Sequence, residues 1–286
     1  MKSSSLARME AVGRRSRSDL LKHLCLIALL GVSLFPFYMM IQVSLKNNTM
    51  FLENPWSFAA PGSWQWDNYV YAIKLVLPYI INSLVVSIGA TIACLTISIS
   101  GAYFFARYQM PFSRILWSAF LVLMLMPTVA NIVPLFSVLQ SLHLLNTLWA
   151  LVLLGASSGL VLTIYVLRNF IEEIPKDLFE AAEMDGASHL HQIIHVVIPM
   201  SKSIIGTLAI LTFLHAWNDF LMPLIVLRDP HLFTLGVGLI YLDGEYVKDW
   251  GRIMASFLVA SLPLIVIFLF SMKLFIRGLG AGAVKG

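Results

Sequence analysis

Six long apolar runs divide the chain, and shorter polar or charged segments separate them. Each run exceeds the roughly 20 residues that a helix needs to cross about 30 Å of hydrocarbon. Backbone amide and carbonyl groups in lipid must be hydrogen-bonded within their own segment, so the runs are predicted to be helices. The pattern therefore predicts an all-α fold, a polytopic membrane bundle of six transmembrane helices. The runs cover approximately residues 20–45, 79–106, 115–142, 147–167, 204–227 and 255–276.

The composition agrees with a membrane protein. Of the 286 residues, 59% are hydrophobic and only 12% are charged, whereas soluble domains carry about 25% charged residues. The apolar runs leave no room for a separate soluble domain. We therefore expect a basic N-terminal tail at residues 1–19, a transmembrane domain at 20–276 and a C-terminal tail at 277–286.

The distribution of lysine and arginine predicts the orientation of the bundle. With a cytoplasmic N-terminus, 14 of the 19 lysines and arginines lie in inside segments and 5 lie in outside loops. This bias is the positive-inside signature of membrane proteins. An even number of spans returns the C-terminus to the cytoplasm, and the charged loop at about 168–203 lies there too. The net charge of +4 therefore reflects topology and does not indicate nucleic-acid binding.

Two segments on the predicted outer side differ in character. The segment 47–78 is rich in aromatic residues and in proline and glycine. Tryptophan and tyrosine commonly anchor proteins at the headgroup level, so we favour that role, with docking or sugar stacking as the alternative. The segment 228–251 carries four acids and is either a contact for a soluble partner or a solvated connector.

The charged loop carries six acids within residues 172–185, so it must face water and is expected to contact another protein. Pro175 suits the first position of a helix, where its missing N–H costs nothing. Lys176–Met184 is then predicted to be a short helix. Leu178, Phe179 and Ala182 give this helix an apolar face, and acids flank it.

A sharp turn is predicted to follow this short helix. Gly186 can adopt a positive φ and reverse the chain direction. Ser188 can cap a second helix over residues 189–198, which would run into the fifth span. Pro199 would kink this second helix where it meets the membrane. Such an arrangement suits a device that passes motion from a docked protein into the bundle.

The residues of this loop fall at intervals that resemble the EAA loop of bacterial ABC-importer permeases. An ordinary amphipathic loop is the alternative, but the match extends well beyond one Glu-Ala-Ala triplet. The resemblance implies a cytoplasmic coupling helix that contacts a separate ATPase. It assigns this contact to Glu180, Ala181, Ala182, Asp185, Gly186 and Ala187. The matching positions are Phe170, Ile174-Pro175, Leu178, Glu180-Ala181-Ala182, Asp185-Gly186-Ala187 and Ile198-Pro199.

Further segments resemble the carbohydrate branch of this family, and together they cover essentially the whole chain. The ending Gly-Ala-Val-Lys-Gly resembles the shorter of two paired permeases, in which the tail extends toward the ATPase dimer. Gly280, Gly282 and Lys285 would then face the ATPase, with a disordered hydrophilic end as the alternative. Ser203 departs from the pattern, since the branch often has a second proline there. The matching segments are Asn82-Ser83-Leu84, Met126-Pro127, Val133-Pro134-Leu135, Leu145-Asn146-Thr147 and Trp217-Asn218-Asp219-Phe220-Leu221.

One acid, Asp219, lies inside a predicted span. Ionisable groups within a membrane usually face a cavity or a partner. With Trp217 and Asn218, Asp219 offers a stacking surface and hydrogen-bond acceptors that suit a sugar. Asn131 in the third run is a further candidate for the substrate pathway. The equally weighted alternative is that Asp219 is structural, bonded to a neighbouring helix or hydrated near the outer end.

The sequence contains no motif for energy conversion. It lacks the phosphate-binding pattern GxxxxGK[ST], so we do not expect this chain to hydrolyse ATP or to bind a cofactor. A membrane enzyme is the third possible class, but the predicted spans contain no nucleophile–base pair or metal set, so we do not expect an enzyme. His191 and His195 lie four residues apart and can share a face, but no third ligand is near, so no metal site is predicted. A secondary transporter or channel is the alternative class. Such a protein is expected to carry several buried ionisable residues, and here Asp219 stands alone.

The resemblance as a whole implies a permease subunit of an ATP-driven carbohydrate importer in the bacterial inner membrane. It implies a second permease, an ATPase dimer that uses ATP and Mg at the cytoplasmic face, and an extracytoplasmic sugar-binding protein as partners within the lipid bilayer. The implied mechanism is alternating access. Movement of the short helix at Lys176–Met184 would then re-aim spans three to five around a central passage.

Overall fold

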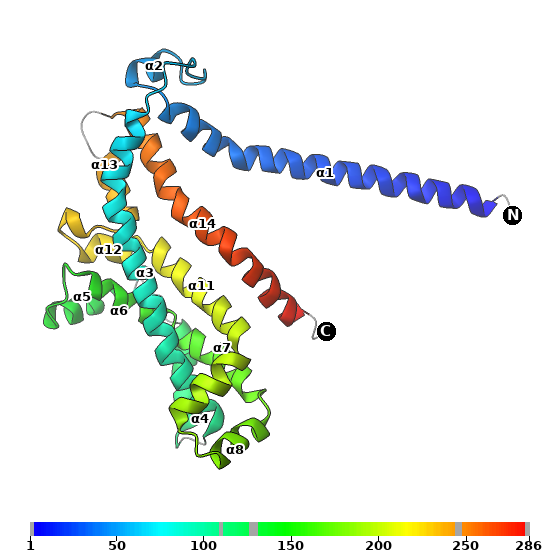
Figure 1. Ribbon diagram of the computed structural model, residues 1–286, viewed down its shortest axis with the longest axis vertical. Helices are drawn as coiled ribbons and strands as arrows, with labels where there is room; N and C mark the ends of the chain where they lie inside the picture. Colours follow the sequence, from blue (N-terminus) through cyan, green and yellow to red (C-terminus); the bar gives the residue numbers. More distant parts are fainter. Residues whose placement is uncertain (1–2, 109–110, 126–130, 244–247, 284–286) are drawn as a thin grey trace. The chain divides into compact units, whose positions relative to one another are not determined.

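The computed structural model describes residues 3–108, 111–125, 131–243 and 248–283, and all regular elements in these ranges are helices (Figure 1). The predicted all-α class is therefore confirmed. The longer helices are α1 (Ser3–Ser44), α3 (Asp67–Arg107), α4 (Ser113–Leu125), α5 (Ile132–Ser141), α6 (Leu148–Ser158), α7 (Leu160–Glu172), α11 (Lys202–Asn218) and α14 (Trp250–Ala283). The shorter elements are α2 (Asn48–Glu53), α8 (Lys176–Met184), α9 (His189–Gln192), the π-helical turn η2 (Ile193–Val197), α10 (Ile198–Met200), α12 (Leu221–Val226), the 3₁₀ turn η3 (Pro230–Leu232) and α13 (Leu235–Asp243).

The chain folds into two compact units. Unit 1 comprises residues 1–73 and 246–259, and unit 2 comprises residues 74–245 and 260–286. The charged loop and the candidate passage residues therefore belong to unit 2. The helices α1 and α14 continue without a break past residues 19 and 276. The boundaries predicted for the two terminal tails therefore fall within helices.

Three described helices are long and apolar enough to cross a membrane, namely Lys22–Ser44 within α1, all of α3, and Trp250–Leu269 within α14. Two bent pairs raise the number to five: α6 with α7, bent by 44°, and His189–Met200 with α11, bent by 88°. The predicted run 115–142 falls on α4 and α5, which are 13 and 10 residues long, with residues 126–130 outside the described part. The count of six spans therefore stays a prediction.

The predicted fifth run, 204–227, is not one helix. Helix α11 ends at Asn218 and α12 begins at Leu221, because Asp219 has an extended backbone with ψ of 121°. The Asp219 Oδ1 atom accepts a hydrogen bond of 3.3 Å from the Met222 backbone N–H and so satisfies one of the first amides of α12. The prediction of a continuous helix was wrong. It relied on the average hydrophobicity of the run, and that average does not reveal a single side chain that ends one helix and caps the next.

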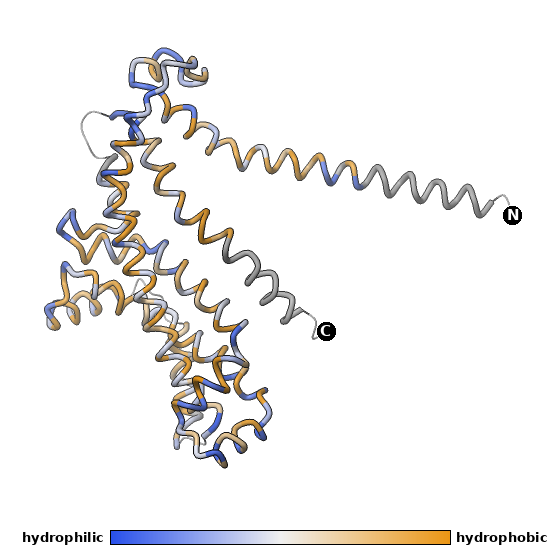
Figure 2. The backbone as a smooth tube through the Cα atoms, viewed as in Figure 1, coloured by the Kyte–Doolittle hydropathy of each residue, from blue (hydrophilic) through white to orange (hydrophobic). Residues whose placement is uncertain are grey.

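Figure 2 shows mostly apolar residues along the middle of the segment Lys22–Ser44 of α1, and the most apolar stretch of this helix has no residue buried within the chain. Leu29, Val32 and Leu34, for example, are all exposed. A helix that is apolar on every side requires an apolar environment. Lipid or the apolar surface of other helices supplies such an environment in a membrane.

In unit 1, the aromatic outer segment is a folded structure, and part of it is helical. Helix α3 begins at Asp67, twelve residues before the predicted second run, and contains Pro78. The Asn68 amide donates to the carbonyls of Ser44 and Lys46, each at 2.9 Å, and the Lys46 ammonium donates to Asn54 O at 2.8 Å. Burial lowers the pKa of Lys46. These hydrogen bonds hold the segment after α1 in a defined fold, where the sequence predicted a loop.

In unit 2, the outer segment after Arg228 packs onto α3. The Asn82 amide donates to the carbonyls of His231 and Phe233, at 2.9 and 3.0 Å, and the Ser83 hydroxyl accepts from the Leu235 N–H at 2.8 Å. Helix α13 follows, with Leu235, Val237 and Gly238 buried. Of the two alternatives, a solvated connector is therefore excluded for residues 233–238, and contact with a soluble partner stays a prediction.

The small residues of α6 allow close helix packing. A Cβ atom placed on Gly155 would lie 2.9 Å from the Ala90 Cβ of α3 and 3.5 Å from the Ala216 Cβ of α11. The first distance is shorter than a van der Waals contact between carbon atoms. Gly155 therefore lets three helices approach one another at the middle of unit 2.

Candidate coupling loop and passage

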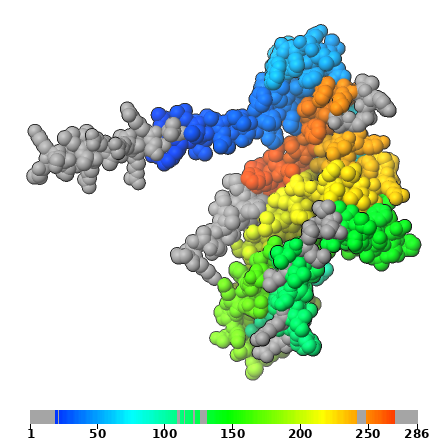
Figure 3. Space-filling model, turned by 180° about the vertical axis from the view of Figure 1, so that it is seen from behind, coloured from blue at the N-terminus to red at the C-terminus, as the bar shows by residue number. Residues whose placement is uncertain are grey.

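Helix α8 has the bounds predicted from the sequence, Lys176–Met184. Pro175 lies one residue earlier than expected, at the N-cap, with φ of −53° and ψ of 132°. Its ring sets φ for the start of the helix without removing a needed donor. The loop lies at one end of unit 2, where α8 is exposed along much of its length (Figures 1 and 3).

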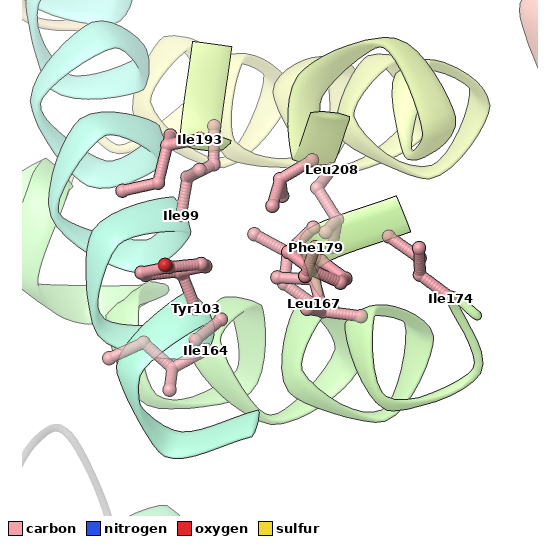
Figure 4. Packing of buried hydrophobic residues seen from close by; sticks show 11 residues of the cluster. Ile99, Tyr103, Ile164, Leu167, Ile174, Phe179, Ile193 and Leu208 are labelled. Atoms are coloured by element: carbon pink, nitrogen blue, oxygen red, sulfur yellow. The ribbon is translucent and has the colours of Figure 1, made fainter. Parts of the chain in front are cut away.

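A single side chain of α8, Phe179, anchors it to the bundle. Phe179 has no exposed surface, whereas Leu178 is 42% exposed and Met184 is 88% exposed. Figure 4 shows Phe179 surrounded by apolar side chains from α3, α7 and α11. The predicted apolar face is therefore narrower than expected. The cluster comprises Ile99, Ala102, Tyr103, Ile164, Leu167, Ile171, Ile174, Phe179, Ile193, Val197 and Leu208.

A cation lies on the ring of Phe179. The guanidinium carbon of Arg107 lies 4.1 Å from the ring centroid, well within the distance of a cation–π contact. Arg107 is the last residue of α3, where a positive charge also interacts favourably with the helix dipole. The stacked pair thus joins the end of α3 to α8, and the Tyr103 ring of α3 also packs near Phe179, with ring centroids 6.3 Å apart.

The turn after α8 is a Schellman motif. The Ala187 N–H donates to Ala182 O at 2.9 Å, and the Gly186 N–H donates to Glu183 O at 3.0 Å. This pair of bonds requires a left-handed residue just after the helix, and Gly186 has φ of +77°. The predicted positive φ is confirmed. The acids Glu180, Glu183 and Asp185 of this turn region are exposed.

The second loop helix begins as predicted, because the Ser188 hydroxyl accepts from the His191 N–H at 3.4 Å. It is interrupted by the π-helical turn η2, in which the Ile198 N–H donates to Ile193 O. Pro199 follows and cannot donate a backbone hydrogen bond. The chain then bends by 88° between Met200 and Lys202, at the start of α11. The predicted kink is therefore present.

A hollow of about 460 Å³ lies beside the Schellman turn. The rings of His191 and His195 stack on one side of it, with centroids 3.9 Å apart. In the part of the chain that the structure describes, no three His, Cys, Asp or Glu side chains are grouped to hold a metal ion. The hollow is open to a partner side chain and is lined by Ala182, Asp185, Gly186, Ala187, Ser188, His191, Gln192, His195 and Val196.

The candidate passage residues are only partly brought together. Asn218 and Asp219 line a second hollow of about 440 Å³, together with His215 and two leucines, Leu211 and Leu214. Trp217 is buried and stacks on Phe213, with ring centroids 5.7 Å apart, so it does not line this hollow. Asn131 is the half-buried residue before α5 and is not part of the lining.

The polar residues of the second hollow also have structural bonds. The Asn218 amide donates to Leu214 O at 2.9 Å, and Asp219 caps α12. The His215 Nδ1 atom lies 3.4 Å from the Ser158 hydroxyl of α6. A hollow lined by an imidazole, an amide and a carboxylate can exchange hydrogen bonds with a hydroxylated ligand.

Sequence analysis missed Tyr103, Arg107, Gln192 and His215. A signal for the first pair was available, because Tyr103 and Arg107 are four residues apart at the end of an apolar run and must share one helix face. His215 likewise precedes Asn218 and Asp219 by three and four residues. Gln192 gave no such signal, since its burial depends on residues far away in the sequence.

The C-terminal candidates remain untested by the fold. Gly280 and Gly282 lie in the last part of α14, and Lys285 lies outside the described residues. Their predicted orientation toward an ATPase stays a prediction.

Comparison with known proteins identifies the family. Residues 97–280 match the family described as binding-protein-dependent transport system inner membrane component. The chain is 30% identical to the inner membrane ABC transporter permease protein YcjP of Escherichia coli, over 96% of this chain and 100% of that protein. It is 32% identical to the arabinooligosaccharides transport system permease protein AraQ of Bacillus subtilis, over 88% of this chain and 91% of that protein.

A solved structure shares the fold. It belongs to a bacterial ABC transporter involved in the import of the acidic polysaccharide alginate, and it matches 90% of this chain and 97% of its own chain with a TM-score of 0.76. The sequence identity is 20%, so this likeness concerns the fold. The family match covers both the coupling loop and the second hollow. The chain therefore belongs to the family of binding-protein-dependent transport system inner membrane components and is a permease subunit of an ABC importer.

Proposed function

We propose that this permease carries a sugar or oligosaccharide and that its segment Lys176–Ala187 docks onto a separate ATPase. One observation carries the docking part. Helix α8 is held by the single buried side chain of Phe179, while its acids and the apolar Leu178 and Met184 are exposed. An exposed helix with both apolar and acidic groups fits a partner surface that is apolar at its centre and basic around it.

The hollow beside Gly186 supports the same docking surface. It is large enough for a side chain of the partner, and Asp185 contributes a carboxylate to its wall. The small Ala181 and Ala182 permit a close approach, because larger side chains there would hold the partner away. The residues that we assign to the contact are Glu180, Ala181, Ala182, Asp185, Gly186 and Ala187.

The sugar part of the proposal is supported by the relatives and by the chemistry of the second hollow. AraQ is named for arabinooligosaccharides. Asn218, Asp219 and His215 offer donors and acceptors that suit hydroxyl groups. The alternative of a secondary transporter or channel is disfavoured, because the family is defined by dependence on a binding protein.

The remaining parts of the assembly follow from this role. A second permease completes the passage, a binding protein delivers the sugar from outside, and an ATPase dimer supplies ATP and Mg chemistry. Both termini and the coupling loop lie in the cytoplasm. When the ATPases close, α8 moves and acts through the bend near Ser201 on α11, whose far end carries Asn218. Alternating access of the passage would result.

Glu180→Lys is expected to weaken binding of the ATPase by about tenfold or more, because a like charge then faces a basic surface. Glu53→Lys is the matched control, since it makes the same charge change on α2. Binding of purified ATPase to the permease pair in detergent measures the effect. Equal binding by both variants would refute the assignment of the docking surface to α8.

Asp219→Asn is expected to lower sugar transport per assembled complex by about ten- to a hundredfold, since a hydrogen bond to a charged group contributes about 1.5–3 kcal/mol. Asparagine can still accept from the Met222 N–H, so the cap of α12 is kept. Asp229→Asn is the matched control, because Asp229 caps η3 in the same manner. Normal transport per complex together with poor assembly would instead assign Asp219 to the scaffold.

A further inference from the structure

Two contacts bracket the coupling turn, which we define as residues 180–187, and both lead to the same helix. One contact lies just before the turn and joins Phe179 to Arg107. The other lies just after it and joins Gln192 to Tyr103. Tyr103 and Arg107 are four residues apart near the end of α3, so they share one face and lie about 6 Å apart along the axis.

The first contact is buried and depends on the cation. Phe179 has no exposed surface, and the Nε atom of Arg107 is buried without a hydrogen-bond partner within the described part of the chain. The face of the Phe179 ring is therefore the contact that the structure gives to the guanidinium of the half-buried Arg107. Movement of α8 away from α3 would leave this cation without its partner.

The second contact is a chain of hydrogen bonds that ends on the coupling turn itself. The Tyr103 hydroxyl donates to Gln192 Oε1 at 2.8 Å, and Gln192 Nε2 donates to Ala187 O at 3.4 Å. The amide of Gln192 is thus oriented from both sides, and its side chain is 1% exposed. Breaking either bond would leave a buried polar group without a partner, which is unfavourable.

His189 adds a further connection to the same end of α3. Its Nδ1 atom lies 3.2 Å from the hydroxyl oxygens of both Tyr103 and Tyr108. The imidazole also packs edge-on against the ring of Tyr108, with ring centroids 5.5 Å apart.

We propose that Arg107 and Tyr103 are positioning residues for energy coupling, which make the cytoplasmic end of α3 follow the coupling turn when the ATPase moves it. This proposal rests on the proposed docking of the ATPase to α8. Both flanks of the turn are fixed to one helix face. The turn therefore cannot shift relative to α3 without losing the cation–π contact of Arg107 or the buried hydrogen bond of Tyr103. The second span is thereby driven directly, in addition to the fifth span that continues from the loop.

The test measures sugar moved per ATP hydrolysed by the complete complex in lipid vesicles. Arg107→Gln and Tyr103→Phe are expected to lower this ratio by about two- to tenfold, while the amount of assembled complex and the affinity for the ATPase stay the same. Arg107→Lys keeps a cation above the ring and is expected to restore most of the ratio. A purely structural role would reduce assembly and leave the ratio unchanged, which would overturn the proposal.

Two control variants make the same kinds of substitution, Arg to Gln and Tyr to Phe, at other positions of unit 2. Arg168 stacks on Trp117 at 4.6 Å and pairs with Glu172, so Arg168→Gln removes a similar cation–π contact that involves no residue of α8 or of the coupling turn. Tyr165→Phe removes a hydroxyl from α7 outside the Gln192 network. Both controls are expected to keep the normal ratio, and a reduced ratio in either would mean that the effect is not specific to α3.

A double substitution tests the hydrogen-bond chain separately. If Tyr103 acts through Gln192, Tyr103→Phe combined with Gln192→Leu should lower the ratio no further than the single changes do. Additive losses would contradict the chain. Failure of the underlying docking has a different signature, because Glu180→Lys would then leave ATPase binding intact. If that binding is lost while the ratio is normal in the Arg107 and Tyr103 variants, the docking holds and only this inference fails.

Discussion

Gly186→Val is expected to abolish sugar transport while the permease still inserts into the membrane. The Schellman turn needs φ near +77° at this position, and left-handed backbone costs an L-residue with a Cβ about 1–2 kcal/mol, with β-branched side chains among the least tolerant. A Cβ on Gly186 would meet no atom within 4 Å, so the effect must come from the backbone and not from a clash. Transport by reconstituted complexes measures the loss.

Gly186→Asn is the matched control for this prediction. Asparagine adds a side chain but adopts the left-handed region more readily than valine does, so it should retain a substantial share of transport. Equal activity of the valine and asparagine variants would contradict the role assigned to the turn. Such a result would mean that coupling to the docked ATPase does not depend on the direction in which the chain leaves α8.

Phe179→Ala is expected to detach α8 and to have the largest effect on stability of any single change in the loop. Truncation of a fully buried phenylalanine costs about 3–5 kcal/mol, and here it also removes the ring beneath the Arg107 guanidinium. The thermal transition of the purified permease in detergent should fall by several degrees, and binding of the ATPase should be lost.

Leu178→Ala provides the control on the adjacent residue. Leu178 is 42% exposed and lies outside the buried cluster, so its truncation should leave the thermal transition nearly unchanged. Phe179→Ala with an unchanged transition would show that α8 is held by something other than the buried ring. Phe179→Leu, which keeps an apolar side chain, should fall between the two.

The coupling loop was predictable from the sequence because its signals are local. Four features of this loop each depend on residues within a few positions of one another. They are the bounds of α8, the positive φ of Gly186, the cap by Ser188 and the kink near Pro199. Capping, proline geometry and glycine freedom act over such distances, so the order of residues specifies them.

Other features depend on residues far apart in the chain and were missed or wrongly predicted. The folded outer segment of unit 1 requires Asn68 to bridge back to Ser44 and Lys46. The packing of residues 230–238 requires Asn82 and Ser83 of α3. In both places a polar side chain forms hydrogen bonds with the backbone of a segment that has no regular hydrophobic pattern. A hydropathy profile contains no information about such bonds.

The sequence by itself determined the all-helical class of the protein and the chemistry exposed on the coupling turn, since apolar length and local turn signals are sufficient for these. Only the tertiary structure decided how the turn is attached to the bundle. The burial of Phe179 and Gln192 depends on α3, whose Tyr103 and Arg107 precede them by more than 70 residues. A contact across such a separation forms only when several helices pack at once, so no local pattern encodes it.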